Sequence, residues 1–389
     1  MATYYVDGSV TSAGGSGSGT LGDPWVKTED LIQYALVQIA AGSGAGADGD
    51  TIIVLAGTLT NTAQLDPTVW LAGSGTGARP LWIKAVNPAV TIDWDMGATN
   101  MIVYPYQGVH WAGFRFYNFK ENGASYPFKI FRYHTFSSCI FDGYAAQHYG
   151  LIGGNVSVAI IGCSFVNDNR YMPAGQGSRG YQTNMSNGII YGNYFETTSA
   201  AGNGYYSHGT GSAHVEGNIY YDTCSYSNGL YVPTQGARFS RNTFYNGGTA
   251  APCIYAPSNY NNSFLIANNY FEGWTDAIKS TANRLSIGRV CGNKGFNNSA
   301  LLGASLIEND NCAYDFHAAY WKNDSLAESA LINPANKDFR PKSALVGAGF
   351  DSMALNYPNV GGGVQPNVGA VEGFDPNPLI GQYNPFGSQ

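Results

Sequence analysis

Charged residues are scarce in this chain of 389 residues: they make up 12 % of it, about half the usual share of a soluble domain. The formal net charge is −7 and no basic run exists, which argues against a nucleic-acid partner, because phosphate binding needs clustered Lys and Arg. No apolar stretch reaches the length of a membrane span, about 18 residues, so no membrane association is expected. The first residues also lack the basic start and apolar run of a secretory leader.

Metal-binding patterns are missing as well. The six cysteines form no Cys-x-x-Cys pair, the histidines show no ligand spacing, and no calcium loop of alternating Asp and Gly is present. The sequence therefore predicts no cofactor, and a calcium ion would be expected only if the protein were a polysaccharide lyase. The cysteine spacing is better explained by the repeat described next than by disulfides.

Glycine and tyrosine are abundant, with 51 and 28 residues, and such a composition favours strands and turns over surface helices. A short pattern recurs: an apolar residue, two variable residues, Asn or Cys, one variable residue, and an aromatic residue. Seven copies are clear, although the first has Phe at the central position, and an eighth has lost its aromatic residue. Their central residues are Phe114, Cys139, Cys163, Asn193, Asn218, Asn242, Asn269 and Asn293.

The central residues follow one another at intervals of 24–30 residues, which is what three short strands and three turns require. We therefore predict an all-β fold: one right-handed parallel β-helix of about 25 residues per coil, whose coils stack about 4.8 Å apart. The asparagines are expected to form a ladder of side-chain amides at a tight bend. Cys139 and Cys163 would lie one above the other in the interior, and we interpret them as free thiols, with a disulfide as the alternative.

Four segments are expected. Residues 1–50 form an N-terminal strand and a capping helix over 29–41, with Thr28 as its N-cap, because the end coil of a solenoid must be covered. Residues 51–300 form the β-helix and residues 301–355 form its last turns and C-terminal cap. Residues 356–389, rich in Gly, Pro and Asn, form an extended tail.

Several segments resemble the pectate-lyase-like superfamily of right-handed parallel β-helices. They are the opening Tyr4-Tyr5-Val6-Asp7, the strand Asp50-Thr51-Ile52-Ile53-Val54, the Asn-x-aromatic repeats, and the closing segments 337–341, 346–349 and 367–372. The resemblance covers most of residues 3–372. It implies the fold and leaves the activity open, because the superfamily includes polysaccharide lyases, glycoside hydrolases, epimerases, adhesins and phage tail or capsid proteins.

Signals for catalysis are weak. A polygalacturonase-like hydrolase would need clustered aspartates, but its Asn-Thr-Asp strand and Asp-Asp pair are absent, and of its Gly-His-Gly motif only His208-Gly209 is present. A lyase must abstract the proton next to a uronate carboxyl group. The longest coil, residues 163–193, carries Asp168, Arg170 and Arg179, which would be the catalytic candidates of a lyase; an ordinary charged loop is the alternative.

Tyrosines give a positive signal. Tyr206, Tyr231 and Tyr255 each lie thirteen residues after a ladder asparagine, and Tyr181 extends the series. Their preceding neighbours are mostly aliphatic, so strand alternation predicts that the tyrosines point outward on one face. Such a stripe can bind sugar rings, form a subunit interface, or stabilise the sheet by stacking.

Together these features favour a non-catalytic structural or glycan-binding protein of a virion, such as a phage capsid decoration, fibre or spike component. By resemblance to phage β-helices we expect a homotrimer, with other virion proteins or a surface glycan as partners. The alternative is an extracellular polysaccharide lyase or glycoside hydrolase that acts on an acidic polysaccharide.

Overall fold

The computed structural model describes most of the regular coils and leaves out many of the loops between them. The residues described are 2–43, 50–63, 65, 81–87, 91–95, 101–103, 108–118, 128–130, 134–142, 152–153, 158–168, 187–197, 212–222, 230–231, 238–248, 252–256, 265–280, 289–302 and 324–342. Within them, no helix is long and apolar enough to cross a membrane.

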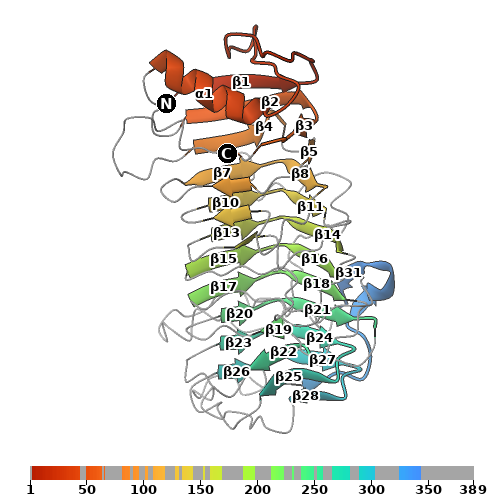
Figure 1. Cartoon of the computed structure of the whole chain (residues 1–389). Coiled ribbons are helices and arrows are strands. Elements are labelled where there is room, and N and C mark those ends of the chain that lie inside the picture. Colours follow the sequence, from red (N-terminus) through yellow and green to blue (C-terminus); the bar gives the residue numbers. More distant parts are fainter. Residues whose placement is uncertain are drawn as a thin grey trace.

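The described chain forms a rod of stacked parallel strands (Figure 1). The first sheet has eleven strands, in the order β1 (Thr3–Gly8), β2 (Asp50–Gly57), β4 (Leu81–Ala85), β7 (Val109–Ala112), β10 (His134–Ser137), β13 (Val158–Ile161), β15 (Asn187–Tyr191), β17 (Ser212–Glu216), β20 (Arg238–Ser240), β23 (Leu265–Ala267) and β26 (Arg289–Cys291).

The second sheet runs beside the first and also has eleven strands. They are β3 (Leu59–Thr60), β5 (Ile92–Asp95), β8 (Phe114–Tyr117), β11 (Ile140–Asp142), β14 (Ser164–Asp168), β16 (Tyr194–Thr197), β18 (Ile219–Asp222), β21 (Thr243–Asn246), β24 (Tyr270–Glu272), β27 (Lys294–Phe296) and β29 (Asp324–Ser325). The third side consists of two shorter sheets: β6 (Met101–Val103), β9 (Phe128–Ile130) and β12 (Ile152–Gly153), then β19 (Leu230–Tyr231), β22 (Ile254–Ala256), β25 (Asp276–Ser280) and β28 (Ala300–Leu302).

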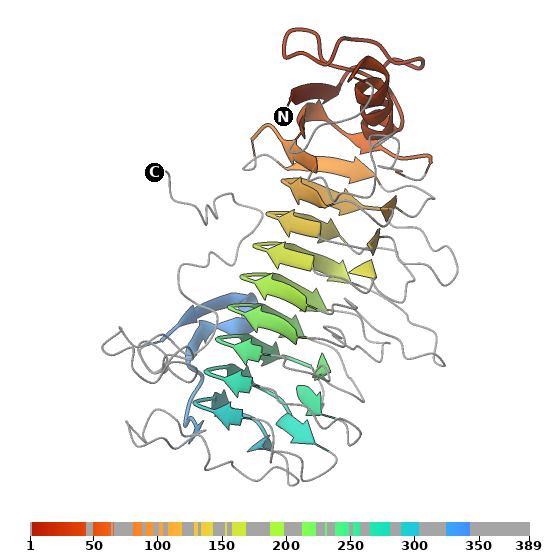
Figure 2. The ribbon, with the colours of Figure 1, turned by 90° about the vertical axis from the view of Figure 1, so that its left-hand side faces the viewer.

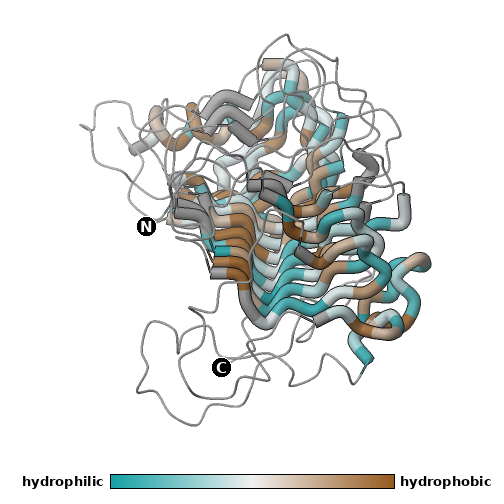
Figure 3. Tube along the Cα trace, turned by 90° about the horizontal axis from the view of Figure 1, so that it is seen from below, coloured by the Kyte–Doolittle hydropathy of each residue, from teal (hydrophilic) through white to brown (hydrophobic). Residues whose placement is uncertain are grey.

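The predicted parallel β-helix is thus confirmed, and equivalent residues of successive coils lie in columns (Figure 3). The aromatic residue of the repeat shows this best. From Phe141 to Phe271 the rings stack with their centroids 4.6–4.9 Å apart, which matches the separation of neighbouring strands. The core is therefore filled by contacts between like residues of adjacent coils.

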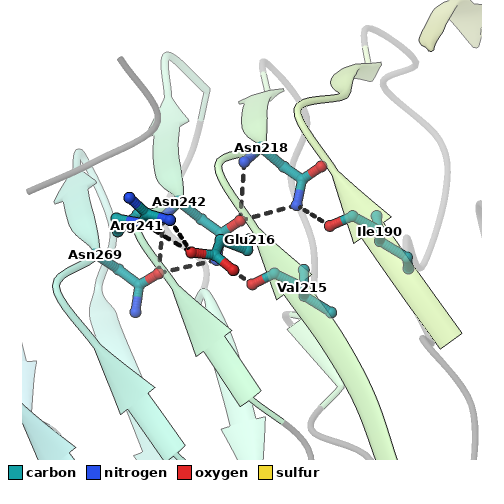
Figure 4. A network of polar contacts seen from close by, with 7 residues as sticks. All are labelled: Ile190, Val215, Glu216, Asn218, Arg241, Asn242 and Asn269. Atoms are coloured by element: carbon teal, nitrogen blue, oxygen red, sulfur yellow. Dashed lines mark hydrogen bonds and ion pairs between the residues drawn. The ribbon is translucent and has the colours of Figure 1, made fainter. Parts of the chain in front are cut away.

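An asparagine ladder fixes the sharp turn between the first and second sheets (Figure 4). Asn218 Oδ1 accepts hydrogen bonds from the backbone N and the Nδ2 of Asn193, both at 2.9 Å, and Asn218 Nδ2 donates to Ile190 O and Asn242 Oδ1. The same pattern continues through Asn269 to Asn293. These side chains are fully buried, so the ladder satisfies backbone groups that water cannot reach.

The turn itself needs a left-handed backbone conformation just before each asparagine. Gly192, Gly217 and Gly292 supply it with φ angles near 60°, whereas Arg241 and Asn268 adopt it in the other coils. Upstream, Cys163 takes the asparagine position, and its backbone N donates to Asn193 Oδ1. Cys139 and Cys163 are buried free thiols, as predicted, and burial raises the pKa of the Cys163 thiol.

Helix α1 (Leu31–Ser43) covers the N-terminal end of the rod (Figure 1). Its buried face consists of Leu31, Ile32, Ala35, Leu36 and Ile39. The predicted N-cap was wrong: the Thr28 hydroxyl accepts a hydrogen bond from Ser12 N, and the helix begins two residues later than expected. Asp30 precedes it with a φ of 52°, and the Asp30 carboxylate is bound instead to Thr62 and Ala63 of the following coil.

A C-terminal clasp, residues 326–342, folds back over the outer face of the second sheet (Figure 2). It contains β30 (Leu331–Asn333), the short helix η3 (Pro334–Asn336) and β31 (Asp338–Pro341). Phe339 is buried against the rings of Tyr194, Tyr221 and Tyr245, which come from three successive coils. The sequence predicted last turns and a C-terminal cap over residues 301–355, and the clasp, which is the described part of that range after β29, lies along the side of the rod.

Polar contacts complete the clasp. Lys337 Nζ lies 2.9 Å from both carboxylate oxygens of Glu196, which also accepts a hydrogen bond from the Tyr194 hydroxyl. Burial, together with the nearby Glu196 carboxylate, raises the pKa of Tyr194. One end of the clasp is held by Ala330 N, which donates to the Tyr270 hydroxyl. The tail 356–389 lies outside the described residues.

His134 is an exception in the apolar interior. It is buried on the inner side of β10, in register with Val158, and neither ring nitrogen has a hydrogen-bond partner. Burial lowers its pKa to about 3, with a smaller contribution from His110, so the ring is neutral at physiological pH.

Replacing Asn218 by Ala should lower the free energy of unfolding by about 2–4 kcal/mol, because Asn193 N loses its buried acceptor and Ile190 O loses its donor. Chemical denaturation measures this change. The control is Asn333→Ala, at an exposed asparagine whose side chain makes no capping bond. Equal stability of the two variants would contradict the structural role of the ladder.

Replacing Phe339 by Ala should open the clasp, because about 3 kcal/mol of packing against three tyrosines is lost. Amide hydrogen exchange in Leu331–Pro341 should then accelerate by about a hundredfold, while exchange in α1 stays unchanged. Arg340→Ala, at the exposed neighbouring position, serves as the control and should leave both regions unchanged.

Replacing His134 by Leu should make the stability less sensitive to acid. In the wild type the unfolded chain takes up a proton near pH 6.5 and the folded chain does so only near pH 3, so stability falls as the pH drops between these values. Between pH 7.5 and pH 5 the wild type should lose about 2 kcal/mol more than the variant. Parallel denaturation curves at the two pH values test this, and an equal loss in both proteins would refute it.

Candidate functional site

The third side of the rod brings three chemically distinctive residues into one column. Backbone pairing aligns Tyr231 of β19 with Tyr255 of β22, and Tyr255 with Lys279 of β25. Ile254 and Ile278, one residue before each, are also paired and are buried in the core. The exposed Lys279 follows the buried Ile278, so it lies on the outer face of this sheet, and Tyr231 and Tyr255 hold the same register position on the neighbouring strands.

Lys279 carries the charge of this column. Its side chain is 45 % exposed, and its Nζ lies 3.4 Å from Asp276 Oδ2 on the same strand. The ion pair is only partly shielded from water, so it orients the ammonium group and contributes little to stability. A solvent-accessible cation in register with two tyrosines can meet a negatively charged ligand whose rings rest on the aromatic positions.

Lys279 was not predicted from the sequence because the segment between its ladder asparagine, Asn269, and the third sheet is shorter than in the two coils before it. Thirteen residues after Asn269 lies Ala282, whereas the structure places Lys279 in the column, three residues earlier. Counting thirteen residues from a ladder asparagine therefore finds the outer column only in coils where the segment between the asparagine and the third sheet has the same length. The change from the buried Ile278 to the exposed Lys279 could not by itself have fixed the register between strands.

The other residues named from the sequence have separate positions. Tyr181, Tyr206, Arg170 and Arg179 lie outside the described residues. Asp168 is the last residue of β14 on the second sheet, where its backbone pairs with Thr197 after a register shift. The described part of the chain therefore does not bring Asp168 together with the tyrosine column.

The second sheet carries a different polar group on its outer face. Arg115 binds Asp142, with Nη2 2.7 Å from Oδ2, and its Nη1 lies 3.5 Å from Asp93 Oδ1. The hydrogen bond to Asp142 is the main cause of the raised pKa of Arg115. Asp95, two residues after Asp93, accepts a hydrogen bond from Asn118 Nδ2. Because its charges are already paired, this group favours a structural role.

The described coils contain no grouped metal ligands: among the residues that the structure describes, no three His, Cys, Asp or Glu side chains lie close enough together to hold an ion. On the first sheet, Glu216 and Arg241 form an ion pair beside the asparagine ladder (Figure 4). Arg241 occupies the left-handed turn position, and this contact holds it to the neighbouring coil.

Comparison with known proteins returns only distant structural likenesses. No family model matches the chain, and no curated protein matches it. Among solved structures, it is similar to the pectate lyase Pel9A, with 15 % identity, a TM-score of 0.42, and 96 % of each chain covered. It is also similar to a mannuronic acid specific polysaccharide family 6 lyase from human gut microbiota, with 11 % identity, a TM-score of 0.31, and 84 % of this chain and 92 % of that chain covered. At these values the likenesses carry no argument about activity, and the fold rests on the strand pairing described above.

Proposed function

We propose that this protein binds an acidic polysaccharide along the third side of its β-helix. The observation that supports the proposal is the register of Tyr231, Tyr255 and Lys279 on three neighbouring strands. Lys279 follows the two tyrosines in this column, and its positive charge favours an acidic ligand, which tyrosines alone would not.

The spacing of the column suits a polymer. Neighbouring strands are about 4.8 Å apart, and an extended chain of sugar rings repeats at a similar interval, so successive coils can meet successive sugars. Tyrosine rings present apolar faces to sugar C–H groups while their hydroxyls reach sugar oxygens. The Lys279 ammonium would pair with a uronate carboxylate, in competition with Asp276.

Cleavage by β-elimination is a second candidate, and Lys279 is the observation that favours it. A deprotonated lysine beside a bound uronate can take the proton next to the carboxyl group. The bond to the leaving sugar then breaks, a carbon–carbon double bond forms, and the leaving oxygen takes up a proton. Binding alone, as in a virion component that recognises a surface glycan, requires no such step, so the two candidates differ in whether the polymer is shortened.

Lys279→Ala should weaken the retention of the protein by polygalacturonate and by alginate about tenfold in affinity electrophoresis, because one charge-assisted contact is lost. Lys84→Ala removes an exposed lysine from the first sheet and serves as the matched control. Equal behaviour of the two variants, or no retention of the wild type by either polymer, would refute the proposed binding face.

The same samples decide between binding and cleavage. Elimination produces unsaturated sugar ends that absorb in the near ultraviolet, and Lys279→Ala should abolish this absorbance. Lys279→Arg should abolish it as well, because arginine keeps the positive charge but is too basic to accept the proton. Retention without any absorbance change in the wild type would favour the non-catalytic role. Sedimentation of the wild type would in addition test the expected homotrimer.

A further inference from the structure

The outer face of the first sheet carries an exposed tryptophan. Trp82 of β4 is 41 % exposed. The other tryptophans in the described part of the chain are all buried: Trp25, Trp94, Trp111 and Trp274. An exposed tryptophan on a regular strand leaves apolar surface in contact with water that a ligand could cover.

His110 of β7 holds this tryptophan in a fixed orientation. The two rings are stacked, with centroids 4.0 Å apart and planes 14° from parallel, and the two residues are paired across the strands. Partial burial lowers the pKa of His110, so the imidazole is neutral at physiological pH. The pair forms a rigid, uncharged aromatic wall that stands on the sheet.

A second wall stands farther along the same face. Ile189 and Tyr191 of β15 are 51 % and 38 % exposed. Three strand steps separate β7 from β15, about 14 Å at the usual spacing, and Figure 1 shows these strands in succession. Between the walls, β10 and β13 contribute a floor of partly exposed, uncharged residues: Thr135, Ser137, Ala159 and Ile161. Together these residues form an uncharged strip on the outer face of the sheet, called the aromatic strip below.

We propose that this aromatic strip binds a neutral oligosaccharide, independently of the acidic polymer on the third side. Its described walls offer ring faces for stacking against sugar C–H groups, and the Thr135 and Ser137 hydroxyls offer partners for sugar hydroxyls. The Ser137 hydroxyl donates to Trp111 O and can still accept a hydrogen bond from a ligand.

Charge is the reason for a neutral sugar. The four floor residues carry no charge, and His110 is neutral, so a uronate placed there would lose water from its carboxylate without gaining a cation on the floor. The exposed Lys84 lies on β4, two residues after Trp82, and Ala112 of β7 separates it from Ser137 of the floor. Aromatic side chains for stacking, combined with hydroxyl groups, therefore fit a neutral hexose better than a uronate.

The test uses the full-length protein and three probes: cellohexaose, maltohexaose and mannohexaose, each titrated while tryptophan fluorescence and heat are recorded. At least one probe should bind and shift the emission of the exposed Trp82 to shorter wavelength. Trp82→Ala should remove that shift and weaken the binding measured by heat about tenfold, and Tyr191→Ala should weaken it in the same way from the other wall. Trp82→Phe keeps a ring at the wall and should retain most of the affinity.

Two control variants show whether the effect belongs to the aromatic strip. Val37→Ala removes an exposed apolar side chain of α1 and should change nothing, and Lys279→Ala should leave neutral-sugar binding intact even if acidic-polymer binding is lost. The inference is overturned if none of the three probes binds, or if Trp82→Ala and Tyr191→Ala bind like the wild type. It is equally overturned if these two variants change the sedimentation of the protein instead, because the face would then be an interface between copies of the chain.

Discussion

The amide ladder at the turn between the first and second sheets sets the register on which the other contacts depend. Each asparagine is bound to the coil before it and to the coil after it, so a coil cannot slip along its neighbour without breaking several buried hydrogen bonds. The stacked rings of the core, the buried thiols and the column that ends in Lys279 all inherit their alignment from this turn. The loops of the coils can vary in length because the ladder, not the loop, carries the alignment.

The sequence predicted what repeats and missed what occurs once. The asparagine positions and the aromatic residue two places later recur in successive coils, so their spacing was enough to infer the fold. The clasp has no repeat, and its main ion pair joins Lys337 to Glu196, which lie 141 residues apart along the chain. The prediction of Thr28 as a helix cap was wrong for a similar reason. The Thr28 hydroxyl accepts a hydrogen bond from Ser12 N, and the Asp30 carboxylate accepts one from Thr62 N of the next coil. Such contacts follow from the three-dimensional arrangement and leave no local pattern.

The same regularity explains how much of the candidate site was within reach. Tyr231 and Tyr255 could be aligned by counting because two consecutive turns have equal length, and the shorter turn before Lys279 defeated the count. The wall of Trp82 and His110 could not be read from one sequence, because an aromatic residue on an alternating strand can face either side. A β-helix therefore offers several independent faces, and each can be given its own chemistry without disturbing the ladder.

The position of the clasp also bears on the order in which the molecule is made. A solenoid can fold from its N-terminal end as the chain leaves the ribosome, because each coil needs only its predecessor. The tyrosines at 194, 221 and 245 are then assembled while Phe339 is still unmade, and covering them must wait roughly a hundred residues, about 5–20 s of synthesis. During that interval the nascent rod exposes a row of tyrosine rings to solvent, which favours aggregation. Folding of the clasp, the last described part of the chain, covers these rings and ends that risk.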